Sequence, residues 1–482
     1  MDAITATLLI LTIIPAASYG WGMRGTTIGG EKGAMLPGAI IGGLLALFSD
    51  VLIVKEHFYI FSALGAVAMY FGGCMTYGET LSFSMSARPA TNMRKGLIAL
   101  LVKGFLWFGV FGTIFATGVN AVSRVFGIID LIVIIIITPL LAILFYKLFN
   151  HPLDVNDNKY PRIYFSKTRK ESWGAMLGIF TSLFLYNIIR GNFFSIVFPL
   201  SCGIFGGLGW VLGQLIQVYS RQYADETESS FGKLFSPSRG VEGWKAMECT
   251  FGAFGGLGAA IGLILTHNSF RDTVFNLEMT TGLRPYNKIL SVILLIIWLL
   301  LLGGDIAHYF IKKPSDDSKF SKAYSIYKRS LEPTEFILYA SLPFIMICLG
   351  DDKTARITSF FILFWVIVQE VAYEGKMTLK KSLILKIPLS ILGAVILLLT
   401  FIAKDLLDYR FTFVLYTVIY ELLTFIVIIP DFIKETKKKA EAVDSADLGL
   451  IKLFRNVIKG NKTLVVHGYF IICIAITLAM II

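Results

Sequence analysis

The chain has 482 residues, of which 55% are hydrophobic and only 16% are charged, and its mean hydropathy is +0.71. A soluble protein carries about 25% charged residues, so this composition excludes an ordinary soluble protein. The net charge of +11 does not indicate a nucleic-acid partner, because Lys and Arg gather between apolar runs and no basic domain accompanies them.

Long apolar runs predict an all-α integral membrane protein, because a helix needs about 20 mostly apolar residues to span a bilayer. The runs indicate a polytopic bundle of about fourteen transmembrane helices. In chain order they are expected at 3–19, 34–54, 58–75, 97–119, 127–147, 173–189, 192–219, 245–266, 288–311, 333–350, 354–373, 383–402, 409–430 and 463–482. The segments 3–19 and 173–189 are short enough to be re-entrant, in which case twelve helices span.

Basic residues are distributed unevenly between the expected loops. When each loop is counted with the helix ends beside it, 33 of the 44 Lys and Arg residues fall in alternate loops, beginning with the first. Cytoplasmic loops carry such an excess. The protein is therefore expected in a cell membrane (plasma or inner) with both termini extracytoplasmic. A cytoplasmic linker, 312–332, would separate a membrane core, 1–311, from a C-terminal group of helices, 333–482.

Two short signatures recur along the chain and predict a parallel internal repeat of four helices, 34–147 and 173–311. One is a glutamate followed closely by Ala-Met at a helix entrance, and it occurs at 31–38, 171–178 and 242–247. The other is an acidic residue followed by an arginine, Glu79 with Arg88 and Glu226 with Arg239. Equivalent positions lie 140 to 151 residues apart, and near-constant spacing is the mark of a duplication. The alternative is chance recurrence of common residues near helix starts.

Glycine distinguishes the first part of the chain, since residues 1–262 contain 35 of the 44 glycines. Several are spaced four residues apart: Gly38/Gly42, Gly203/Gly207, Gly209/Gly213, Gly252/Gly256 and Gly258/Gly262. Small residues at this spacing let membrane helices approach closely. We therefore expect a tightly packed core in the first part and looser packing of the C-terminal helices.

The most unusual stretch is the glycine-rich segment 18–33, which lies just ahead of an expected helix N-terminus. Backbone amides there can bind an anion, and an arginine adds charge. Neither a P-loop nor a dinucleotide-binding pattern fits, and a re-entrant turn whose glycines only permit close packing is the alternative. Together with the recurring loop residues, the expected substrate-binding set is Trp21, Arg24, Thr26, Glu31, Glu79, Arg88, Glu226, Arg239 and Glu242.

Ionisable residues inside apolar runs are costly and mark functional positions. Glu421 lies in the middle of 409–430, and Asp305 and His308 share a helix face, so these three are the candidates for proton coupling. Lys103 is expected to extend toward the membrane interface. Polar side chains also lie near cytoplasmic helix ends, at Gln214, Gln217 and Glu248. The histidines and cysteines show no ligand spacing and no cofactor motif is present, so neither a metal nor a cofactor is expected.

These features favour a multi-pass transporter or permease for a small solute that could be an anion, bound in the cytoplasmic half of the bundle. Its expected partners are the lipid bilayer and that solute. The alternative is a membrane-embedded transferase that acts on a lipid or lipid-linked substrate from the cytoplasmic side. In that enzyme Glu79 or Glu226 would be the general base, and Arg88 or Arg239 would hold a phosphate. A third possibility is a non-catalytic scaffold or subunit.

Overall fold

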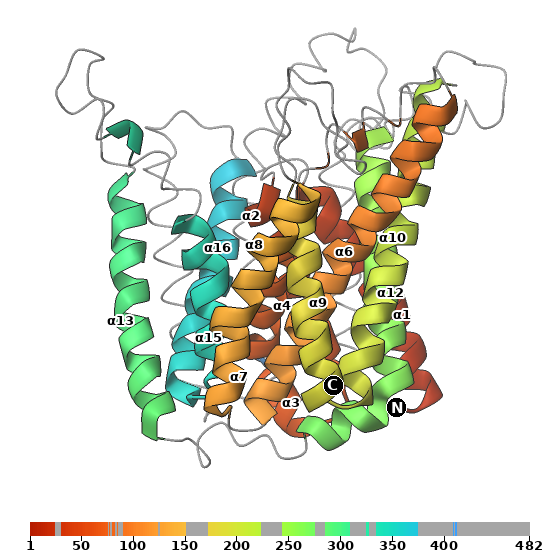
Figure 1. The fold of residues 1–482 in the computed structure, drawn as a ribbon. Helices are drawn as coiled ribbons and strands as arrows, with labels where there is room; N and C mark the ends of the chain where they lie inside the picture. The colour runs from red at the N-terminus through yellow and green to blue at the C-terminus, as the bar shows by residue number, and fades with distance from the viewer. Residues whose placement is uncertain are drawn as a thin grey trace, which may run out of the picture.

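The computed structural model describes residues 1–24, 30–75, 77, 80–81, 84, 90–123, 126–150, 172–222, 243–274, 285–308, 324–326, 334–374, 408 and 410–411. At the helix ends 23–24, 30–31, 90–92, 220–222, 243, 285, 305–308 and 367–374 only the backbone is described. All regular secondary structure within these ranges is helical (Figure 1).

The helices follow one another along the chain with short interruptions. In order they are α1 (Ala3–Arg24), α2 (Gly30–Leu47), α3 (Leu52–Glu56), α4 (Phe58–Gly73), α6 (Ala90–Ser123), α7 (Ile128–Ile132), the π-helical segment η1 (Val133–Ile137), α8 (Thr138–Phe149), α9 (Trp173–Arg190), α10 (Phe193–Gln222), α12 (Gly243–Val274), α13 (Pro285–His308), the π-helical segment η4 (Ile337–Ser341), α15 (Leu342–Cys348) and α16 (Asp352–Glu374).

Seven helices in the described ranges are long and apolar enough to cross a membrane. They are α1, α6, the continuous unit α7–η1–α8, α9, α10, α12 and α13. The chain is therefore a helical membrane protein with several spans. The segments expected at 3–19 and 173–189 are among the seven, so both are long enough to span. The total of fourteen stays a prediction, because the runs 383–402, 409–430 and 463–482 lie almost wholly outside the described residues.

Two units turn most of their apolar side chains outward. In α7–η1–α8 these include Ile129, Ile136 and Leu140, and in α13 they include Ile296 and Leu300. Both units lie at the margin of the bundle (Figure 1). Exposed aliphatic rows on long helices are what a lipid-facing surface requires.

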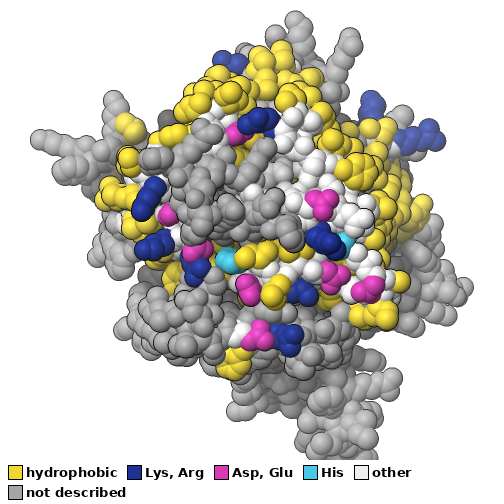
Figure 2. Space-filling view, turned by 90° about the horizontal axis from the view of Figure 1, so that it is seen from below, with side chains coloured by type: hydrophobic (Ala, Val, Ile, Leu, Met, Phe, Trp, Pro, Cys, Tyr) yellow, Lys and Arg dark blue, Asp and Glu magenta, His cyan; other side chains and the backbone are white. Residues whose placement is uncertain are grey.

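The bundle has two ends, which we name as Figure 1 is oriented. At the upper end α1 finishes and α2 and α6 begin, whereas the lower end carries Ala3 and Ile128. Figure 2 views the lower end and shows charged side chains of both signs across it, with apolar side chains toward its edge. Which end is cytoplasmic remains the prediction made from the loop charges.

Glycines bring the helices of the first part into close contact. A Cβ atom on Gly38 would lie 2.3 Å from Gly65 O, so α2 and α4 touch through their backbones. The expected pairs on α10 and α12 behave alike, since a Cβ on Gly213 would lie 2.7 Å from Met247 O and one on Gly252 would lie 2.4 Å from Ala17 O. Gly303 and Gly304 of α13 have nothing within 4 Å of such a Cβ, so this peripheral helix is packed differently.

The structure corrects several helix boundaries. The helix expected at 34–54 is broken, because α2 ends at Leu47 and α3 starts at Leu52. Asp50 between them has φ 57°, a left-handed conformation that ends a helix and that Asp tolerates better than most residues. The helices expected at 97–119 and 245–266 are longer than predicted, running as α6 and α12 over Ala90–Ser123 and Gly243–Val274.

The predicted four-helix repeat stays a prediction. Its first unit is organised around the close contact of α2 with α4. In the second, α9 packs mainly on α8, where a Cβ on Gly178 would lie 2.4 Å from Leu141 O. The recurring signatures themselves fall largely outside the described residues.

Candidate functional site

A closed ring of aromatic side chains lies in the upper half of the bundle, with one member from each of four helices. Ring centroids are 5.2 Å apart for Trp21 and Trp107, 5.4 Å for Trp107 and Trp210, and 4.6 Å for both Trp210–Phe251 and Phe251–Trp21. The four side chains are at most 2% exposed. Tyr77 joins the ring, 5.2 Å from Trp210 and 5.7 Å from Trp107.

Glycines on neighbouring helices make room for these large rings. A Cβ atom on Gly72 of α4 would lie 2.3 Å from Trp107 Cδ1, and one on Gly252 would lie 2.6 Å from Trp21 Cδ1. The aromatic ring therefore depends on small residues at both positions. Edge-on contacts of this kind stabilise aromatic pairs beyond the burial of their surface.

A layer of buried polar groups lies one helical turn above the aromatic ring. Lys103 is 1% exposed, and its Nζ donates a 2.7 Å hydrogen bond to Thr80 Oγ1. Gln214 is fully buried, and its Nε2 donates to Ser84 Oγ at 2.7 Å and to Leu81 O at 3.2 Å. Residues 80–84 thus connect α6 with α10 through polar contacts on both sides.

The orientation of the Gln214 amide follows from its contacts. A main-chain carbonyl only accepts hydrogen bonds, so the group that faces Leu81 O must be the amide nitrogen. Gln214 Oε1 then points elsewhere and has no hydrogen-bond partner among the described residues. A buried acceptor in this position is suited to a donor supplied by water or by a bound solute.

Lys245 ties the end of α1 to α12. Its Nζ donates to Gly22 O at 2.7 Å and lies 3.0 Å from Glu248 Oε2, while Trp244 Nε1 donates to Glu248 Oε1 at 3.0 Å. A cation at a helix C-terminus satisfies its terminal carbonyls and interacts favourably with the helix dipole. Lys245 therefore fixes the last turn of α1, which places Trp21 in the aromatic ring.

We call these residues together the upper cluster, which comprises Trp21, Tyr77, Thr80, Leu81, Ser84, Lys103, Trp107, Trp210, Gln214, Lys245, Glu248 and Phe251. It combines a buried ammonium group, amide and hydroxyl groups, and aromatic faces. Such a set can bind an anionic group at the lysine and pack the apolar body of a solute against the tryptophans.

Most of the predicted substrate-binding residues lie outside what the structure describes. Trp21 is the exception, since its side chain is buried in the upper cluster. For Arg24 at the end of α1, Glu31 in α2, and Asp305 and His308 in α13 only the backbone is described, so no contact tests them. The remaining members lie outside the described residues: Thr26, Glu79, Arg88, Glu226, Arg239, Glu242 and Glu421.

Two expectations were wrong. Lys103 does not extend to the membrane interface, because its ammonium group is buried and bonded to Thr80. The segment 18–33 is not an irregular turn throughout, because α1 continues to Arg24 and α2 begins at Gly30. The hydrophobic pattern could not show either point, because both depend on which helices surround the segment.

A signal for the upper cluster is nevertheless present in the sequence. Residues four apart lie on one helix face, and such spacing joins Lys103 to Trp107, Trp210 to Gln214, and Trp244 to Glu248. Each pair places a polar group and a tryptophan on one side of an apolar helix. The residues that sequence reasoning missed, Trp107, Trp210 and Lys245, all belong to such faces or adjoin them.

Nothing known resembles this chain closely enough to assign its role: no family model, curated protein or solved structure matches it. Within the described residues, no group of three or more His, Cys, Asp or Glu side chains is placed to hold a metal ion. The function is therefore argued from the site alone.

Proposed function

We propose that the protein is a multi-pass membrane transporter for a small anionic solute and that the upper cluster is its binding region. The observation that carries this proposal is Lys103, a buried ammonium group between α6 and the segment 80–84. Removing such a group from water costs several kcal/mol, and within membrane proteins ionisable groups of this kind mark substrate and ion pathways.

Polar groups also continue along α6 below the aromatic ring. Thr113, Thr117 and Asn120 are buried on this helix. Thr117 Oγ1 donates to Asn187 Oδ1 of α9 at 3.2 Å, and Asn120 Nδ2 donates to Ser195 Oγ of α10 at 2.7 Å. We call these five residues the lower row. Hydrogen-bonding groups on both sides of an aromatic layer are the arrangement that passage of a polar solute through the bundle needs.

The test begins with binding, because three tryptophans of the upper cluster report on the site. Purified protein in nanodiscs is titrated with chloride, phosphate, acetate and larger carboxylates while tryptophan fluorescence and the unfolding midpoint are followed. At 100 times its dissociation constant a ligand should stabilise the fold by about 2.7 kcal/mol. Lys103→Met should abolish the response, and the control Lys288→Met, at an exposed lysine of α13, should leave it unchanged.

Transport is then measured with the anion that binds, as uptake into sealed proteoliposomes. Accumulation that depends on Lys103 supports the proposal. An equal response of Lys103→Met and the parent chain would contradict the site, as would the absence of any response to the panel. Conversion of the anion into a lipid-linked product without uptake would instead support the membrane-embedded transferase.

A further inference from the structure

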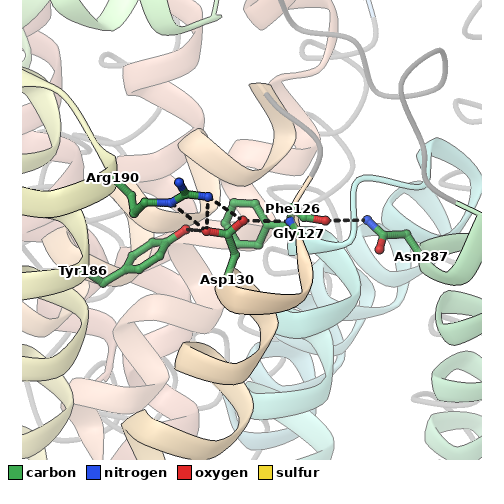
Figure 3. A network of polar contacts seen from close by, with 6 residues as sticks. All are labelled: Phe126, Gly127, Asp130, Tyr186, Arg190 and Asn287. Carbon is green, nitrogen blue, oxygen red and sulfur yellow. Dashed lines mark hydrogen bonds and ion pairs between the residues drawn. The ribbon is translucent and has the colours of Figure 1, made fainter.

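An ion pair outside the upper cluster joins two helices at the lower end of the bundle (Figure 3). Asp130 in the first turn of α7 is 1% exposed, and its Oδ1 lies 3.1 Å from Nη2 of Arg190, the last residue of α9. Tyr186 OH donates to Asp130 Oδ1 at 2.8 Å, and Gly127 N–H donates to Oδ2 at 2.7 Å. The carboxylate is thus held from its own helix start and from α9.

The segment that precedes α7 also connects to the C-terminal helices. Asn287 Nδ2 of α13 donates to Phe126 O at 3.3 Å and to Leu349 O, just after α15, at 3.4 Å. Figure 3 shows this amide and the Asp130 carboxylate on the two sides of the same short stretch, 126–127. A movement of that stretch would therefore change contacts with α9, α13 and α15 together.

An ion pair at the upper end has the same local setting. Lys32 Nζ of α2 lies 2.7 Å from Glu335 Oε1 and sits 5.7 Å from the centroid of the Tyr339 ring. Both acidic residues stand just ahead of a π-helical segment, Asp130 before η1 and Glu335 before η4. Each π-helical segment in turn runs into a proline, Pro139 or Pro343.

The prolines give a reason for these π-helical turns. A proline has no N–H, so the carbonyl four residues earlier loses its α-helical donor. Neighbouring side chains supply donors to these turns: Thr138 Oγ1 donates to Val133 O at 2.9 Å, and Trp298 Nε1 donates to Leu338 O at 2.7 Å. Helices interrupted in this way bend more easily than continuous ones, and π-helical turns are frequent at functional sites.

The lower pair lies at the outer end of the lower row. Asn187, which accepts a hydrogen bond from Thr117, stands one turn before Arg190 on α9. The Arg190 side chain is 46% exposed and that of Asp130 only 2%. When the pair breaks, the guanidinium group can therefore return to water while the carboxylate keeps its bonds to Gly127 and Tyr186. Such a pair can open and close without leaving either charge unsatisfied.

We propose that the Asp130–Arg190 and Lys32–Glu335 pairs are the two gates of the transport path, one at each end of the bundle. This inference rests on the proposed transport function. Each gate opens when its ion pair separates and the helix beside it bends at the π-helical turn, while the other pair stays formed. The ligands that drive the exchange are the transported anion and the water that enters behind it.

The experiment uses one buried reporter in the full chain. Thr113→Cys is introduced after the five native cysteines are replaced by alanine, since Thr113 is fully buried on α6 between the lower gate and the aromatic ring. A membrane-impermeant maleimide is applied separately to each side of vesicles. Asp130→Asn and Arg190→Gln should raise the labelling rate at least tenfold from the lower side, and Tyr186→Phe should raise it less.

Two variants serve as controls. Glu335→Gln weakens the other gate and should not increase labelling from the lower side. Arg356→Gln removes an ion pair of similar length, 2.7 Å to Asp352, that lies within α16 and joins no two helices. Labelling at the parent rate in Asp130→Asn, Arg190→Gln and Tyr186→Phe would overturn the gate. So would an equal increase in Arg356→Gln.

Folding and binding are followed in the same samples. A variant that does not elute as a single species is set aside, and the remaining variants decide, because Tyr186→Phe removes only one hydrogen bond. Anion binding reported by the tryptophans should persist in every gate variant. Intact binding with unchanged labelling refutes the gates alone, whereas loss of binding in the parent chain refutes the proposed function.

Discussion

The contact between α2 and α4 offers a stability test with a control at the neighbouring residue. A Cβ atom on Gly42 would lie 2.3 Å from Phe61 O, whereas one on Gly43 would lie 3.5 Å from Ser62 Cβ. Ordinary contact begins at 3.4 Å, so Gly42→Ala requires the two backbones to separate by the difference, about 1.1 Å. Such overpacking costs about 1–3 kcal/mol.

The control cancels the intrinsic preference of the helix. Replacing Gly by Ala inside a helix is favourable by about 1 kcal/mol at either position. Gly43→Ala should therefore be neutral or stabilising. Gly42→Ala should be less stable than Gly43→Ala by about 1–3 kcal/mol, which is the overpacking term alone.

The assay is the fraction of protein that remains monodisperse after heating in detergent, followed by size-exclusion chromatography. Gly42→Ala should show a lower midpoint than both the parent and Gly43→Ala. Equal midpoints for the two variants would refute the claim that the backbones touch at Gly42. A lower midpoint for Gly43→Ala would equally contradict the placement of that face.

Two further predictions concern the upper cluster and the cysteines. Lys245→Met removes the donor to Gly22 O and the ion pair with Glu248, so it should lower the free energy of unfolding by about 1–3 kcal/mol, measured by the same heating assay, while Lys245→Arg should lose less. Cys202 and Cys348 are fully buried and Cys74 is partly exposed. N-ethylmaleimide should therefore modify Cys74 first, as read by mass spectrometry of peptides, and early modification of Cys202 would contradict its packing.

Several features were predictable from the sequence because they depend on neighbours along the chain. A helix satisfies its own backbone hydrogen bonds, and inside a membrane it must do so. Apolar runs of sufficient length therefore predicted the spans of α9, α10 and α13 to within a few residues. Glycines four residues apart, such as Gly209/Gly213, predicted helix faces that approach closely, because a missing side chain has the same effect on any partner helix.

Other features were decided only by the tertiary structure. Lys103 looked like a side chain that reaches the interface, yet the segment 80–84 and α10 cover it in the fold. The aromatic ring joins Trp21 to Trp107, Trp210 and Phe251, which are separated by 86 to 230 residues, and no spacing along the chain encodes that meeting. The same holds for Asp130, whose partners Tyr186 and Arg190 come from another helix.

The physical reason lies in the kind of interaction. Helix formation in a membrane is governed by the length and polarity of one segment, and both are written in consecutive residues. Partner choice between helices depends on shape, small residues and hydrogen bonds summed over two surfaces, and in lipid no hydrophobic preference separates one apolar face from another. The sequence by itself thus determined that this chain crosses a membrane several times and which of its faces are small. Only the packed bundle decided that a lysine, two glutamines' helix faces and three tryptophans would share one site.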